Sequence, residues 1–199
     1  KIKEDKNKNN PNTVQATVIT EKVKHDTDDP AIWINPSDAS KSLIIGTDKD
    51  TDGALYAFDL SGKVVKRVGG IQRPNNVDIA YGILVNGKKV DVAVTTERQA
   101  NKIRVFTLPD LQPIDNGGID VFAGETEKDP MGVALYTRPS DQAVFAIVGR
   151  KTGPADAYLW QYQLKDNGKG AITGEVVRKF GKYSGKKEIE AIAVDNELG

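Results

Sequence analysis

Short runs that alternate between apolar and polar residues, separated by Gly, Asp and Asn, fill most of the chain. Val, Ile, Thr, Tyr and Phe dominate these runs, and the apolar spacing of a long amphipathic helix is missing. Because successive side chains of a strand point to opposite faces, the alternation indicates strands. The sequence therefore predicts an all-β protein.

One apolar element recurs four times, as Asp29–Trp33, Asn76–Ala80, Met131–Leu135 and Glu190–Val194. The intervals between the copies are close to those of propeller repeats, about 40–50 residues. Three further strand-like runs follow each of the first three copies. They cover 43–48, 54–60 and 63–68, then 90–97, 103–108 and 118–123, and then 143–149, 157–164 and 172–180.

This grouping in fours predicts a β-propeller of four-stranded antiparallel blades. The chain would supply three blades and the first strand of a fourth, whereas closed propellers have about four to eight blades. Three blades alone would expose apolar sheet faces, so we expect a part of a larger ring. A β-sandwich or an irregular all-β domain is the alternative that the pattern leaves open.

The composition of the chain excludes several classes of function. The 199 residues include 28 basic and 28 acidic side chains, so the basic excess of a nucleic-acid-binding protein is missing. No apolar run reaches the roughly 18 residues of a membrane span, and we expect no membrane partner. The absence of cysteine excludes a cysteine nucleophile, a thiolate metal site and a disulfide. The single histidine, His25, lies outside any basic motif of a histidine phosphatase.

The start of the chain is polar and rich in Lys and Asn, and its first residue is not Met. Such a composition cannot bury enough apolar surface to fold by itself. We therefore expect residues 1–24 to form a polar N-terminal extension of a processed chain. Residues 25–199 would form the partial propeller domain.

A basic residue begins the turn after the second predicted strand of each blade: Lys49, Arg98, and the pair Arg150 and Lys151. Equivalent turns of successive blades lie at one mouth of a propeller, so the sequence predicts a rim of cations. Lys and Arg form charge-assisted hydrogen bonds with phosphate oxygens, which suits a polyanion. Ordinary solvated turn residues are the alternative.

Oxygen-bearing side chains gather where the innermost strands begin. They are Asp28, Asp29, Asn75, Asn76, Asp78, Glu188 and Glu190. Carboxylate, amide and backbone carbonyl oxygens are hard ligands that suit calcium. Capping and turn hydrogen bonds by Asp and Asn are the alternative interpretation.

Several segments resemble the Bacillus-type β-propeller phytases. The run Asp-Thr-Asp-Asp-Pro-Ala-Ile-Trp-Ile-Asn at 26–35 resembles the opening motif of that family, and Asn-Asn-Val-Asp-Ile at 75–79 resembles its second motif. Residues 86–92 look like family sequence, and 188–197 resemble the segment around a Thr-Glu-Gly-Met-Ala motif. The resemblance covers about residues 26 to 199. The family ring has six blades, so the chain would supply about its first half.

The resemblance implies a calcium-dependent phosphomonoester hydrolase. Its substrate would be myo-inositol hexakisphosphate (phytate) or calcium-phytate, attacked by a metal-activated water. It also implies a bacterial protein secreted to the periplasm or outside the cell. The remaining half of the propeller would be its partner.

Site residues follow from the same resemblance. Those matching phosphate-contacting positions are Lys49, Arg98 and Arg150, with Lys151 adjacent. The carboxylates matching calcium sites are Asp29 and Glu190. Backbone carbonyls for calcium would come from Pro30 and Val77, and the neighbours of these sites are Asp28, Asn75, Asn76 and Asp78. The catalytic group would comprise Lys49, Arg98, Arg150 and Glu190.

The sequence departs from the family at three places. Met131 stands where a family tyrosine contacts phosphate, Asp50 lies near a family lysine, and Ala191 replaces a glycine. Two alternatives therefore stay open. The chain could be an incomplete domain that binds calcium and phosphate with little activity of its own, or a propeller scaffold without enzymatic activity.

Overall fold

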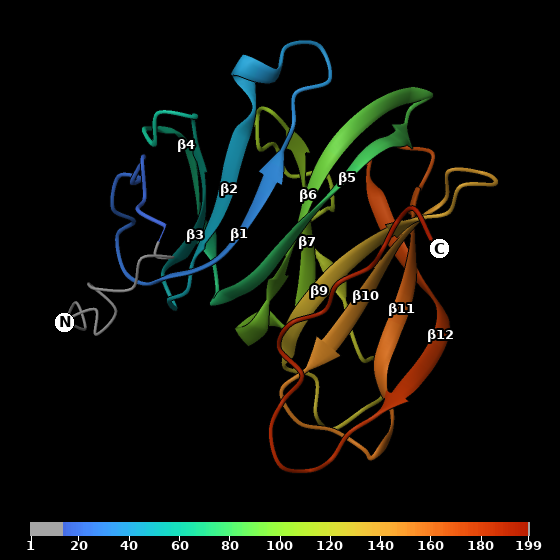
Figure 1. The fold of residues 1–199 in the computed structure, drawn as a ribbon. Coiled ribbons are helices and arrows are strands. Elements are labelled where there is room, and N and C mark those ends of the chain that lie inside the picture. The colour runs from blue at the N-terminus through green and yellow to red at the C-terminus, as the bar shows by residue number, and fades with distance from the viewer. Residues whose placement is uncertain (1–13, 199) are drawn as a thin grey trace.

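The computed structural model describes residues 14–198, and in these residues strands and two short 3-10 turns are the regular elements (Figure 1). The 3-10 turns are η1 (Ala39–Lys41) and η2 (Arg98–Ala100). The strands are β1 (Thr27–Trp33), β2 (Leu43–Asp48), β3 (Gly53–Phe58), β4 (Val64–Ile71), β5 (Pro74–Val85), β6 (Lys88–Glu97), β7 (Lys102–Leu108), β8 (Ile119–Asp120), β9 (Pro130–Thr137), β10 (Val144–Arg150), β11 (Asp156–Asp166) and β12 (Ile172–Lys182). No helix among the described residues is long and apolar enough to cross a membrane.

The strands form three antiparallel sheets of four, each in chain order: β1–β4, β5–β8 and β9–β12. The predicted all-β class and the grouping in fours are confirmed. Strand β8 is much shorter than the run predicted at 118–123. Gly118 and Phe122, which flank it, have positive φ angles of 107° and 52°, and an extended strand cannot continue through such residues.

The sheets contact one another through their first strands, β1 with β5 and β5 with β9. In Figure 1 these three strands face the middle of the molecule, whereas β4 and β12 lie at its periphery. The arrangement is propeller-like. Any side chain at the start of β1, β5 or β9 is therefore placed near the same central region.

Apolar cores fill the spaces between neighbouring sheets. Trp33, Leu55 and Phe106 belong to one buried cluster of the first and second sheets. Val94 and Trp160 belong to another, of the second and third sheets. The second sheet is therefore buried on both faces, between the first sheet and the third.

The far face of the first sheet is covered by the chain before β1. Glu21 accepts a hydrogen bond at its carboxylate from Val64 N (2.6 Å), and its own N–H donates to Gly62 O (2.7 Å). Lys24 N donates to the Tyr56 hydroxyl (3.2 Å). Part of the predicted polar extension is thus docked on the sheet. Residues 1–13 of that extension lie outside the described residues.

The fourth predicted inner strand, Glu190–Val194, is not a strand in the structure, and this prediction was wrong. The segment crosses the third sheet beside two facing glycines. A Cβ on Gly132 would lie 2.2 Å from Glu190 O, and one on Gly149 would lie 3.2 Å from Ile189 O. Because it lies against the face of a sheet whose backbone groups are already paired, the segment finds no strand with which to form a ladder.

Candidate functional site

Three cations occupy the same backbone position in the three sheets. Each donates its backbone N–H to a carbonyl just before the first strand of its own sheet. The pairs are Lys49 with Asp26 (2.7 Å), Arg98 with Arg73 (3.2 Å) and Lys151 with Asp129 (2.8 Å). We call Lys49, Arg98 and Lys151 the rim cations. The structure thus brings out the predicted repeat of basic residues, with Lys151 as its third member.

Arg150 does not belong to this set, although the sequence analysis predicted it to be a cation of the rim. Its side chain is fully buried, 3.4 Å from Glu125 and 4.3 Å above the Phe122 ring. It also donates to the carbonyls of Glu127 (3.1 Å) and Ala157 (2.9 Å). The register between β9 and β10 shifts just before Arg150, which turns its side chain into the protein and leaves Lys151 on the rim.

The rim cations differ in their partners. Lys49 forms an ion pair with Asp28, and Lys151 forms one with Glu188 at 3.0 Å. Within residues 14–198 the Arg98 guanidinium has neither an ion-pair partner nor a hydrogen-bond acceptor. Arg98 is therefore the rim cation whose charge is available to a ligand without first breaking a contact.

A threonine two residues before the rim cation links neighbouring sheets. The Thr47 hydroxyl accepts from Asp29 N (2.9 Å) and donates to Asn75 O (2.8 Å). In the second sheet, Thr96 accepts from Asn76 N (3.1 Å) and donates to Met131 O (3.0 Å). Each hydroxyl ties the first strand of its own sheet to that of the next, and so sets where the following cation lies.

These links escaped the sequence analysis, although the repeated Thr–acid–base runs at 47–49 and 96–98 carried a signal. The third sheet has Gly149 at the equivalent position, and Glu188–Val194 lies beside it. A threonine side chain there would occupy the space of that segment. The third sheet therefore lacks the link that the first two have.

We predict that Thr96→Val will lower the free energy of unfolding by about 2 kcal/mol, because it leaves a buried N–H and a buried carbonyl without partners. Urea unfolding measures the change. Thr173→Val removes a hydroxyl that bonds Lys165 O at an exposed site (3.3 Å), and should change stability by less than about 0.5 kcal/mol. Equal effects of the two variants would contradict the role of Thr96.

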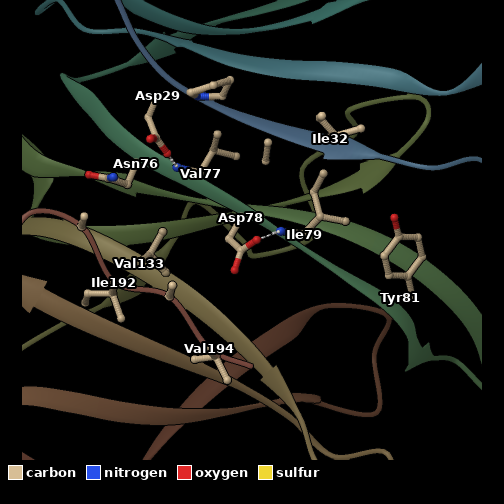
Figure 2. Close-up of a pocket in the computed structure, with 14 residues that line it drawn as sticks. Asp29, Ile32, Asn76, Val77, Asp78, Ile79, Tyr81, Val133, Ile192 and Val194 are labelled. Carbon is tan, nitrogen blue, oxygen red and sulfur yellow. Dashed lines mark hydrogen bonds between the residues drawn. The ribbon is translucent and has the colours of Figure 1, made fainter. Parts of the chain in front are cut away.

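A cleft of about 380 Å³ lies beside the first strands (Figure 2). Its polar side chains are Asp29, Asn76, Asp78 and Tyr81, and residues 191–194 close one side of it. Figure 2 shows the Asp29 and Asp78 carboxylates on neighbouring strands. The structure thus brings together three of the residues predicted to bind calcium.

Both carboxylates bind the backbone of the next strand. Asp29 accepts from Val77 N (3.0 Å), and Asp78 accepts from Leu135 N (2.7 Å) and from Ile79 N (2.8 Å). Burial raises the pKa of Asp29 above its ordinary value, and the charges of Asp28 and Asp78 raise it further, against the lowering by the Val77 hydrogen bond. Burial also raises the pKa of Asp78. The cleft holds negative charge for which a bound cation would compensate.

The donor atoms of the cleft suit a hard cation. The Asn76 side-chain oxygen is buried without a hydrogen-bond partner, beside the two carboxylates. Pro30 and Val77, the predicted carbonyl donors, line the same cleft. Carboxylate, amide and carbonyl oxygens are the ligands that calcium takes. These residues fit part of a calcium site.

Other predicted ligands lie elsewhere. The side chain of Asp28 pairs with Lys49, and Glu190 is exposed and does not line the cleft. Asn75 is buried, and both polar atoms of its side chain lack partners. In residues 14–198 no three acidic or histidine side chains are grouped closely enough to hold a metal by themselves. The donor set of the cleft is therefore partial.

The chain is thus an all-β protein of repeated four-stranded sheets, each with a cation at the same turn, and it has a cleft that carries two carboxylates. The model of the phytase family matches residues 3–199. The chain therefore belongs to the phytase family, as its motifs had indicated.

A curated relative, the 3-phytase of Bacillus subtilis (strain 168), is 32% identical over 178 residues. The match covers 86% of this chain but 44% of the relative, so the chain spans less than half of the length of that protein. The crystal structure of the computationally designed Ika4 protein matches with a TM-score of 0.51 and 14% identity. It covers 92% of this chain and 87% of that one, and supports the fold alone.

Proposed function

We propose that the chain supplies a phosphate-binding rim and part of a calcium site to a phytase that hydrolyses myo-inositol hexakisphosphate. The observation that carries this proposal is the repeat of Lys49, Arg98 and Lys151 at one backbone position in three sheets of a phytase-family chain. A substrate with several phosphates needs several cations spaced around it, and successive sheets supply them.

The propeller is the architecture that suits such a rim. We propose that the three sheets are consecutive blades of a six-bladed ring, completed by a remaining half that supplies further metal ligands. Support comes from the contacts of β1 with β5 and of β5 with β9. Carboxylates of β1 and β5 bind the backbone of the next first strand, which gives successive sheets the same relation to one another.

The chain's own residues would act by binding and orienting the substrate. The planar guanidinium of Arg98 offers two parallel N–H donors to one phosphate, whereas Lys49 and Lys151 offer point charges to neighbouring phosphates. Asp29, Asp78, Asn76 and the carbonyl of Val77 would hold calcium. Bound calcium supplies positive charge and lowers the pKa of a bound water. Met131 is buried, 2% exposed, and contributes no hydroxyl to the phosphate.

We propose a secreted protein of a bacterium, in keeping with the motifs that the chain shares with the Bacillus-type phytases and with its relative in Bacillus subtilis. Hydrolysis is proposed for the complete ring, and calcium and phosphate binding for this chain by itself.

Calorimetry and a phosphate-release assay on the 199-residue chain test the proposal. We expect calcium to bind, myo-inositol hexakisphosphate to bind more tightly with calcium than with a chelator, and hydrolysis to be weak without the remaining half. Asp29→Asn and Asp78→Asn should each weaken calcium binding. A chain that binds neither calcium nor the hexakisphosphate would contradict the proposed function.

A further inference from the structure

Glu188 forms an ion pair with one of the three rim cations. One carboxylate oxygen is 3.0 Å from the Lys151 Nζ, and both side chains are partly exposed. The carboxylate therefore occupies the place at Lys151 that a phosphate oxygen would take.

The segment that carries Glu188 is held in place by other residues. We call residues 188–196 the C-terminal strap; in Figure 1 it is the red segment that passes in front of β9. Ile189 N donates to the Tyr158 hydroxyl (3.4 Å), and Asn196 accepts from Thr137 N (2.8 Å) and donates to Leu135 O (3.2 Å). The Glu188 carboxylate has no part in these bonds, so its charge can be removed while the strap stays docked.

The rim is consequently neutralised unevenly. Asp28 compensates Lys49, Glu188 compensates Lys151, and Arg98 has no carboxylate partner within the described part of the chain. A phosphate that binds at Lys49 or Lys151 must therefore displace the acid paired with that cation.

We propose that Glu188 is an internal competitor for phosphate at Lys151 and thereby helps to determine which anions the rim accepts. This inference rests on the proposed function, because it concerns the same rim. A phosphate carries about −1.5 to −2 charges at pH 7, against −1 for the carboxylate, and can therefore displace it. Displacing Glu188 costs free energy. A substrate with several phosphates offsets that cost through its contacts with the other cations, whereas a single phosphate has no such contacts. The rim should then favour polyphosphorylated ligands.

The test compares phosphate binding by the intact chain and by Glu188→Gln, which keeps the shape of the side chain and removes its charge. Exposed ion pairs are worth little, so inorganic phosphate should bind about two- to fivefold more tightly to the variant. The relative gain for myo-inositol hexakisphosphate should be smaller, so its preference over inorganic phosphate should fall. Calorimetry with a chelator present measures both without calcium.

Two further variants separate a local effect from a general one. Glu197→Gln removes the same charge from an exposed residue beyond the strap and should leave both affinities unchanged. In a Lys151→Met background, Glu188→Gln should no longer tighten phosphate binding. Urea unfolding midpoints within error of the parent would show that the strap stays docked.

The outcomes distinguish the two proposals. If the parent chain binds myo-inositol hexakisphosphate but Glu188→Gln leaves phosphate affinity unchanged, or tightens it as much as Glu197→Gln does, the competitor role is overturned and the proposed function stands. A gain that persists without Lys151 overturns it as well. If neither the parent nor any variant binds a phosphate ligand, the rim itself is not an anion site and both proposals fail.

Discussion

Arg150→Ala should lower the free energy of unfolding by about 3–5 kcal/mol, whereas Lys151→Ala should change it by less than about 0.5 kcal/mol. The Arg150 side chain is fully buried between Glu125 and the Phe122 ring, and its loss leaves Glu125 and three carbonyl groups without their donor. Lys151 is 40% exposed and makes an ion pair at the surface. Urea unfolding of the two variants measures the contrast.

A conservative replacement sharpens this result. Arg150→Lys keeps the charge but loses the planar fork that reaches several acceptors, so it should recover only part of the stability. If Arg150→Ala unfolds like the parent chain and weakens phosphate binding instead, Arg150 belongs to the rim, and the register of β10 described above is wrong.

Arg98→Ala should weaken the binding of myo-inositol hexakisphosphate by roughly 10- to 100-fold, because charged hydrogen bonds contribute about 1.5–3 kcal/mol. Arg98 is the rim cation without a carboxylate partner among residues 14–198, so a ligand gains its full interaction. Calorimetry measures the affinity. The unfolding midpoint should stay near that of the parent chain.

Arg178→Ala is the matched control for this experiment. Arg178 is an exposed cation on β12 whose guanidinium lies over the Phe180 ring (4.6 Å), at the periphery of the molecule. The same charge is lost, but far from the first strands, so affinity should fall by less than about twofold, since exposed charges at a distance are screened by salt. Similar losses in both variants would show that only net charge matters.

Much of the fold could be predicted because strand signals are local. Alternation between polar and apolar residues marks a strand wherever it occurs, and turn pairs such as Asn86-Gly87 take the positive φ angles that a hairpin requires (50° and 74°). The prediction for 190–194 failed for a physical reason. An apolar, β-prone run becomes a strand only where another strand offers hydrogen bonds, and here the segment lies on the face of a sheet.

The sequence could predict where basic residues of the candidate site lie along the chain, but not which of two adjacent residues faces the rim. Arg150 and Lys151 are adjacent and both basic, so their residue types cannot show which one points outward. A one-residue shift in pairing sends a side chain to the opposite face, and the irregularity between Val148 and Arg150 made that choice. The two threonine links were missed because the repeated Thr–acid–base runs give the residue type but do not show which strand the hydroxyl reaches.

The sequence by itself determined the all-β class, the grouping of strands in fours, the membership of the phytase family and the residue types of the site, because each depends on local pattern or motif. Only the tertiary structure decided which cation lies on the rim and which carboxylates share a cleft. It also decided that Glu188 is opposite Lys151. These arrangements join segments far apart in the chain, and they depend on register and burial, which no local pattern encodes.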